Sequence, residues 1–323
     1  MGVFVSQGYF WSYNSAVRRS AAIATLLVVV VAVTLARASE LEQRLRYEFR
    51  DKTLVLRGFY QGKDLHYDST GTLREPPASG DWTVDGVVRI EDISISGSRL
   101  RIKASREHWG WVNGFSPVHD FDGKGLPDKD EKKNRAVQIE ADLGADITID
   151  GAEAAVSRIF LNSNDSFADV VPDYWKPCVN AALQESSDAK LRSCRFSVEF
   201  LQIPGVQTPP LVSSSGSSSA ETSSSVRALF KMGHGVSPPK VLNQHEPSFS
   251  EPARKSKFQG TVTLGLVVDR SGNASNVHVL TPLGCGLDEE AVRTVETWKF
   301  KPAEKDGDPV AVEIAVEVDF HLY

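Results

Sequence analysis

The chain has 323 residues, enough for two domains, and its 41% hydrophobic and 24% charged residues are ordinary for a globular protein. A formal net charge of −6 at pH 7 argues against nucleic acid as the main partner, because a phosphate-binding face needs a dense cationic surface. Three cysteines are too few for a disulfide scaffold. In an exported chain, Cys178 and Cys194 could form one disulfide and leave Cys285 free, and the sequence alone leaves that pairing open.

An apolar run near the N-terminus indicates export. Basic residues precede AAIATLLVVVVAVTLA (residues 21–36), and an A-x-A-like cleavage pattern follows it and ends at Ala38. The run is short for a membrane span, which needs about 20 residues. We therefore expect residues 1–38 to be a secretory signal peptide, with an uncleaved inner-membrane anchor as the alternative. Either interpretation places the rest of the chain outside the cytoplasm.

Residues 39–205 are predicted to form a β-rich domain that ends in helices. Several stretches alternate apolar with polar residues, which is typical of antiparallel strands with one side in water: 53–60, 64–69, 86–95, 99–105, 137–143 and 146–150. The period then becomes helical in SFADVVPDYWKPCVNAAL (residues 166–183), where Pro172 and Pro177 interrupt it. We expect one or two helices there that cap a sheet or open barrel, with the aromatic residues in the core.

Catalytic or metal-binding chemistry is sparse in this domain. His108, His119, Asp120 and Asp122 lie in a polar, glycine-rich stretch, but their spacing matches neither an EF-hand nor a zinc signature. A solvated excursion between strands is the better interpretation. The sequence also lacks nucleophile-elbow, P-loop, H-E-x-x-H and dinucleotide-binding motifs. We therefore expect no enzymatic activity, no cofactor and no metal.

Residues 206–239 are predicted to be a flexible linker between two domains. Serine dominates SSSGSSSAETSSS (residues 213–225), where no apolar side chain is larger than alanine, and prolines bracket the stretch. Such a composition cannot bury enough apolar surface to offset the entropy lost on ordering. The linker therefore separates the β-rich domain from a second domain at residues 240–323.

The second domain has the clearest pattern. QGTVTLGLVVD (residues 259–269) and ASNVHVL (residues 274–280) predict two strands joined by a tight turn. Residues 287–298 follow with apolar residues at helical spacing and acidic residues in the first turn, where the helix dipole favours negative charge. A strictly alternating strand from Val310 to Leu322 comes last. The fold class is therefore predicted to be α+β: an antiparallel β-rich domain with a helical cap, then a small strand–strand–helix–strand domain.

The second domain resembles the TonB C-terminal domain. The motifs that carry the likeness occur in the family's order: F-x-x-x-A-R-x-x-x-x-x-G-T-V (Phe249 to Val262), V-V-D-x-x-G (Val267 to Gly272), G-L-D-E-x-A-V-x-x-V-x-x-W-K-F-K-P-A (Gly286 to Ala303) and D-G-x-P-V-A-V (Asp306 to Val312). With its export signal and β-rich middle, the chain also resembles exported TonB-family proteins of Acidobacteria. That second likeness is based on L-R-G-F-Y (Leu56 to Tyr60) and V-P-D-Y-W-K (Val171 to Lys176).

The resemblance implies a periplasmic, cell-envelope protein that binds outer-membrane or periplasmic partners by strand pairing. The implied partner-binding residues lie on the last strand, at a sheet edge: Val310, Val312, Glu313, Ile314, Ala315, Val316, Glu317, Val318 and Asp319. The implied partners are an outer-membrane transporter or other envelope protein and, for coupling energy to transport, an inner-membrane motor complex. The alternative is a periplasmic scaffold or adaptor without energy transduction, whose C-terminal domain docks or forms a homodimer.

Departures from the family pattern weigh against force coupling. The apolar run 21–36 contains no histidine, which force-transmitting members place in their anchor to contact the motor. The linker 206–239 is rich in serine, whereas those members have a long proline-rich spacer. Phe249-Ser250 stands in place of the Tyr-Pro entry to the first helix, and proline is displaced to Pro252. We therefore expect the family fold, whereas these departures argue against the family's energy coupling.

Overall fold

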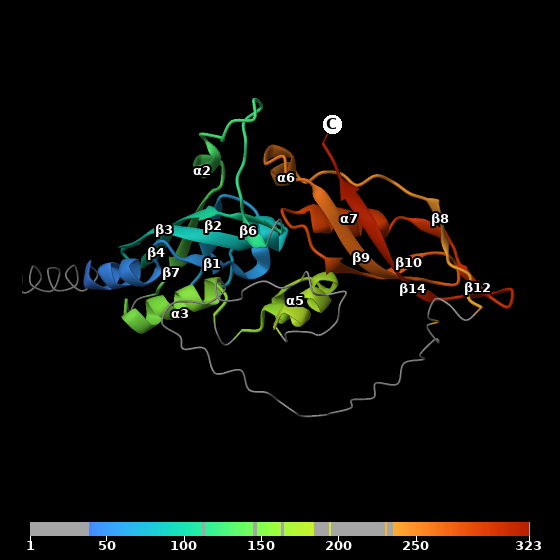
Figure 1. Ribbon diagram of the computed structural model, residues 1–323. Coiled ribbons are helices and arrows are strands. Elements are labelled where there is room, and N and C mark those ends of the chain that lie inside the picture. The colour runs from blue at the N-terminus through green and yellow to red at the C-terminus, as the bar shows by residue number, and fades with distance from the viewer. Residues whose placement is uncertain are drawn as a thin grey trace, which may run out of the picture.

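The computed structural model describes residues 39–111, 114–144, 147–162, 165–183, 194, 230 and 235–322. The predicted signal peptide or anchor and most of the predicted linker lie outside these described residues. Within the described ranges, none of the helices has both the length and the apolar character that a membrane span requires. The fold is α+β, as the sequence predicts, with one main sheet in each half of the chain and smaller two-stranded pairs beside them (Figure 1).

The first half is built on a five-stranded sheet. Its strands, in spatial order, are β1 (Thr53–Val55), β3 (Val87–Ser96), β4 (Arg99–Arg106), β7 (Ala136–Asp142) and β2 (Asp64–Tyr67). All neighbours are antiparallel except β2 and β7, which run parallel. The alternating apolar side chains of these strands meet the helical residues 39–49 and α3 (Ile149–Ile159) in one buried cluster. Alternation along each strand therefore fills this core from one side of the sheet.

Two of the predicted strands differ in the structure. The stretch 53–60 forms a strand only as far as Val55, and the chain then turns through the short helix η1 (Arg57–Phe59), where Gly58 has a φ of 72°. Residues 147–150 of the strand predicted for 146–150 lead into a helix instead, because Thr148 caps α3 and its hydroxyl accepts the Gly151 amide at 3.1 Å. A threonine at that position satisfies a free amide of the first helical turn, and this local bond outweighs the alternating pattern.

Several short elements were not anticipated from the sequence. The segment between β4 and β7 contains a hairpin and a single helical turn, and a π-helical turn precedes β3. These are β5 (His108–Trp111), β6 (Phe115–Val118), α2 (Glu131–Asn134) and η2 (Trp82–Gly86). Each has four or five residues, so none carries enough periodicity to be recognised from sequence.

The second half confirms the strand–strand–helix–strand order. β9 (Gly260–Val268), β10 (Ala274–Thr281), α7 (Leu287–Val295) and β14 (Val312–Phe320) follow one another, and the sheet order is β10-β9-β14. α7 packs against β9 and β10 (Figure 1). Smaller elements complete this half: β8 (Lys240–Asn243), α6 (Glu251–Lys255), β11 (Lys299–Lys301), β12 (Ala303–Lys305) and β13 (Asp308–Val310). β8 pairs with β11, and β12 pairs with β13.

The β9–β10 hairpin turns as its residues predict. The Asp269 carboxylate accepts the backbone amides of Ser271 and Asn273 at 2.8 and 2.9 Å. Gly272 has a φ of 79°, and a Cβ there would lie 1.9 Å from the Phe300 carbonyl oxygen. Only glycine fits both the left-handed backbone and this close approach.

The helices predicted for residues 166–183 are present, but they do not cap the first sheet. α4 (Phe167–Val170), η3 (Asp173–Trp175) and α5 (Lys176–Leu183) lie between the halves, and η3 and α5 pack on β10 of the second sheet (Figure 1). The disulfide Cys178–Cys194, which the sequence left open, is formed and links α5 to Cys194, whereas Cys285 is free and buried. The predicted core role of the aromatic residues is confirmed by the buried Phe167 and Trp175.

The two halves share a hydrophobic core where they meet, separate from the cluster beneath the five-stranded sheet. A continuous buried cluster includes Trp82 and Trp175 from the first half and Leu264 and Leu287 from the second. The backbones also meet, since the Trp111 amide donates to the Leu283 carbonyl at 2.8 Å and the Cys285 amide donates to the Trp109 carbonyl at 2.7 Å. The β-rich region is therefore docked on the C-terminal sheet by packing, in addition to the covalent connection through residues 206–239.

Candidate partner-binding edge

β14 is an outer strand of the C-terminal sheet. It pairs with β9 along its whole length, from Val312 opposite Val268 to Phe320 opposite Gly260. Its side chains alternate as predicted: Val312, Val318 and Phe320 are buried, and the intervening residues on the other face are exposed. The strand therefore has one face on the core and one in water, with its second backbone edge turned away from β9.

The final strand, predicted from Val310 to Leu322, begins two residues later in the structure, where β14 starts at Val312. Val310 is not on β14, because it belongs to β13, is buried, and pairs with Ala303 of β12. The chain leaves strand geometry at Ala311 before β14 begins. The other predicted residues, Val312 to Asp319, all lie on β14. The long alternating run in the sequence is thus two strands with different neighbours.

The hydrogen bonds at the ends of β14 show which backbone groups point outward. The Phe230 amide donates to the Ala311 carbonyl at 3.0 Å, on the side away from β9. At the other end, the Leu322 amide donates to Oε1 of Gln259, which precedes β9, at 2.8 Å. Because backbone groups alternate in direction along a strand, odd-numbered residues direct N–H and C=O outward and even-numbered residues direct them toward β9.

Most of this outer edge has no partner within the part of the chain that is described. The parallel bridge between Phe230 and Val312 occupies its beginning. From Glu313 to Asp319, none of the described residues pairs with the outer side of β14. An edge of this kind can accept an added strand by backbone hydrogen bonding.

A cluster of buried carboxyl groups lies away from this edge, where the halves of the chain meet. Asp288 accepts the backbone amides of Leu283 and Gly284 at 2.8 and 2.6 Å. Glu289 accepts the indole N–H of Trp175 at 2.8 Å, while its other oxygen is buried without a hydrogen-bond partner. Burial raises the pKa of the Glu289 carboxyl, and the nearby Asp288 raises it further.

Asp81 of the first half completes the cluster. Its carboxylate lies 4.0 Å from the Arg293 guanidinium, and burial, with the Glu289 charge next in importance, raises the pKa of Asp81 to about 8. The sequence predicted acidic residues in the first turn of α7, where the helix dipole favours negative charge. The structure buries Asp288 and Glu289 because the β-rich half covers that end of the helix. No local pattern in the sequence indicates that another segment of the chain covers this end of α7.

The residues considered for a cation are not gathered at one place. His108 and Asp120 lie 3.6 Å apart, and Arg135 donates to Asp120 at 2.5 Å. His119 faces Glu131 at 3.4 Å, while Asp122 accepts the backbone amides of residues 124 and 126. Their carboxylates are thus engaged by arginine or by the loop's own backbone.

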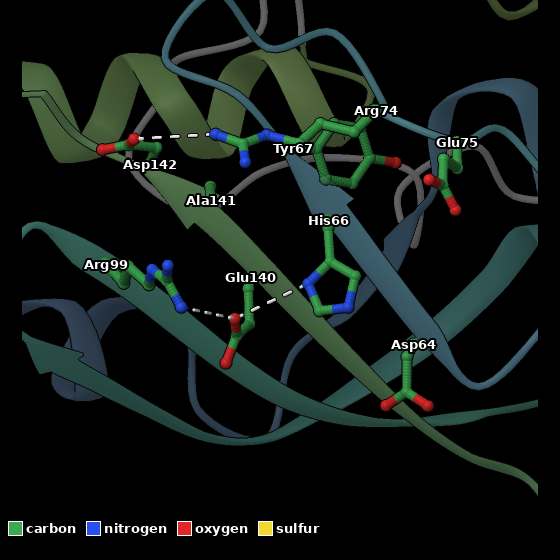
Figure 2. Close-up of a pocket in the computed structure, with 9 residues that line it drawn as sticks. All are labelled: Asp64, His66, Tyr67, Arg74, Glu75, Arg99, Glu140, Ala141 and Asp142. Carbon is green, nitrogen blue, oxygen red and sulfur yellow. Dashed lines mark ion pairs between the residues drawn. The ribbon is translucent and has the colours of Figure 1, made fainter.

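A hollow of about 350 Å³ lies over β2 and β7 on the β-rich half (Figure 2). Charged side chains line it, and they pair with one another. Glu140 lies 3.5 Å from His66 and 3.8 Å from Arg99, and Arg74 lies 3.9 Å from Asp142. These charged groups are engaged with one another at the surface of the sheet, and the open edge of β14 is the stronger candidate for function.

Comparison with known proteins assigns the part of the chain that contains this edge. The family model for the Gram-negative bacterial TonB protein C-terminal region matches residues 245–322. Protein TonB of Vibrio cholerae is 35% identical over 86 residues, which cover 26% of this chain and 35% of the relative. Protein tonB2 of Pseudomonas aeruginosa is 32% identical over 82 residues, covering 25% of this chain and 30% of the relative.

The chain thus spans about a third of the length of the curated relatives it matches. Among solved structures, the Pseudomonas aeruginosa TonB CTD covers 29% of this chain and 94% of its own, at 19% identity and a TM-score of 0.24. A score that low supports no argument, so the assignment depends on the sequence match.

Proposed function

The chain is a TonB-family protein by virtue of residues 245–322, and we propose that it is an exported cell-envelope protein that binds its partner by adding a strand to β14. The observation that supports this most directly is the outer backbone edge of β14, open from Glu313 to Asp319 among the described residues. Backbone hydrogen bonds along that edge supply affinity, and the alternating side chains supply selectivity.

The partner in this proposal is an outer-membrane transporter or another envelope protein. Coupling of energy to transport would also require an inner-membrane motor complex, and residues 1–38 would then have to remain as an anchor. The support for this extension is the family assignment alone, because those residues lie outside the described part of the chain.

A second candidate function is a periplasmic scaffold without energy transduction. The shared core favours it, since the β-rich half is packed on the C-terminal sheet and is not merely tethered to it. In this case the C-terminal half supplies a docking edge, and the β-rich half is a fixed part of the same body. An intact N-terminal anchor on the mature chain favours energy transduction, and a cleaved signal peptide favours the scaffold.

Proline substitutions on β14 test strand addition. Proline has no N–H to donate, so its effect depends on the direction of the amide that it removes. The amide of Ala315 points outward and that of Val316 points toward β9, by the alternation derived above. We expect Ala315→Pro to leave the fold intact and to abolish partner capture, whereas Val316→Pro breaks the β9 ladder and lowers the melting temperature.

The measurement is capture of envelope proteins by the full-length chain, together with thermal unfolding of each variant. Ala315→Ser is the matched control, because it alters the same exposed side chain and keeps the amide. Unchanged capture by a folded Ala315→Pro variant would show that β14 is not the binding edge. Recognition would then pass to the β-rich half.

A further inference from the structure

The open edge of β14 has different chemistry on its two faces, and we propose that it selects a partner strand in which basic and apolar residues alternate. The inference depends on the proposed function, because it describes the strand that would pair with this edge. It concerns the side chains of that partner, whereas the proposed function concerns only its backbone.

The face of β14 toward the core has an incomplete apolar row. Val312, Val318 and Phe320 are fully buried, but Ile314 and Val316 in the middle of the strand are only half-buried. Both pack against the shared core from its rim. An added strand with apolar residues on this face would remove Ile314 and Val316 from water, which is favourable in proportion to the area covered.

The opposite face carries acids without cationic partners. Glu313 and Glu317 are exposed and lie opposite the uncharged Val267 and Thr263 of β9. Asp319, the next acid along the strand, accepts the Thr261 hydroxyl at 2.5 Å. Among the described residues, neither Glu313 nor Glu317 forms an ion pair with lysine, arginine or histidine. A neighbouring strand therefore meets two uncompensated negative charges on this face.

Spacing sets the pattern that the partner must have. Glu313 and Glu317 are four residues apart, so about 13 Å of strand separates them on the same face. Between them on this face β14 presents only the small side chain of Ala315, which lies opposite Gly265 of β9. The His278 ring lies over Gly265, where a side chain of that residue would be. Two lysines or arginines four residues apart, with a small residue between, match these carboxylates across the new strand pair.

The competing interpretation is that the acids only keep the edge from aggregating. Acids with that role alone would keep other sheet edges from pairing with β14, and they would not favour cationic residues at particular positions of a bound strand. The two interpretations predict different behaviour toward peptides that share an apolar face and differ in charge.

Two synthetic nine-residue peptides provide the test. Both have valine at alternate positions for the apolar face, and they differ at two intervening positions four residues apart, with lysine in one and glutamate in the other. Binding to the full-length chain is measured by fluorescence anisotropy at low and at high salt. We expect the lysine peptide to bind about tenfold more tightly at low salt, because each of two cross-strand pairs changes from attractive to repulsive.

Substitutions test whether the preference for the lysine peptide comes from Glu313 and Glu317. The double variant Glu313→Gln/Glu317→Gln should lose most of the preference. Glu296→Gln, which removes an exposed acid just beyond α7, should keep it. Equal binding of both peptides, with both lost in Ala315→Pro, overturns the charge inference and leaves strand addition standing. Failure of both peptides to bind also overturns it, and capture by Ala315→Pro then decides separately whether strand addition itself is correct.

Discussion

Replacing Asp81 by asparagine should make the chain less sensitive to pH. The Asp81 side chain is 24% exposed, lies at the junction between the halves, and has Arg293 at 4.0 Å as its cationic partner. Burial and the neighbouring Glu289 raise its pKa from the ordinary value of 3.8 to about 8. Asparagine keeps the size of the side chain and cannot ionise, so it removes this titration while changing little else.

The direction in which stability changes with pH depends on whether the folded or the unfolded chain holds the Asp81 proton. Between pH 5 and pH 7 the folded chain keeps the Asp81 proton, whereas the unfolded chain has released it. The native state then binds more protons, so the free energy of unfolding falls as pH rises through this window. Each pH unit is worth about 1.4 kcal/mol for one such group, which gives about 2–3 kcal/mol between pH 5 and pH 7.

The assay is urea unfolding of the full-length chain and of Asp81→Asn at both pH values, followed by tryptophan fluorescence. We expect the variant to gain about 2–3 kcal/mol relative to the wild type on going from pH 5 to pH 7. Asp308→Asn, which changes an exposed acid at the start of β13, is the control and should follow the wild type. If Asp81→Asn also follows the wild type at both pH values, the buried carboxyl cluster does not hold a proton at neutral pH.

Two further substitutions test the core and the disulfide. Trp298→Ala should lower the free energy of unfolding by about 3–5 kcal/mol, because the ring is 3% exposed and its N–H donates to the His245 carbonyl; an unchanged melting temperature would contradict its burial against the C-terminal sheet. Cys178→Ser should cost about 3 kcal/mol in urea unfolding, since the bridge to Cys194 closes a loop with a sequence separation of 16. Adding reductant to the wild type should have the same effect, and no effect of either would mean that the bridge contributes nothing to stability.

Local pattern was sufficient for the C-terminal elements. Period-two alternation predicted which face of β14 is buried, and helical spacing with acids at the start predicted α7. The glycine and asparagine of the β9–β10 turn indicated the hairpin, and the ordered motifs around it indicated the family. These predictions were possible because each depends on residues that lie close together in the chain.

Two predictions of strands were wrong because alternation of apolar and polar residues is compatible with more than one local structure. The alternation in residues 146–150 predicted a strand, but the Thr148 cap turned it into the start of α3. The run from Val310 to Leu322 reads as one strand, yet Val310 pairs with β12 and Val312 pairs with β9. Alternation shows that residues share a face, but it does not show whether one neighbour or two lie beside them.

The sequence by itself determined the longer elements of the C-terminal half and which of their faces are buried, and the tertiary structure decided what covers those faces. The helices of residues 166–183 were visible in the pattern, but only the folded chain places Trp175 against Glu289 of α7. The packing around that contact buries acids which local rules assign to the surface. That burial raises the pKa of Glu289, although the hydrogen bond from Trp175 itself lowers it. The direction of the Ala315 amide likewise depends on β9 being its neighbour on one side. Periodicity records the side on which a residue lies, whereas burial and pairing depend on segments distant in the sequence, which the pattern does not contain.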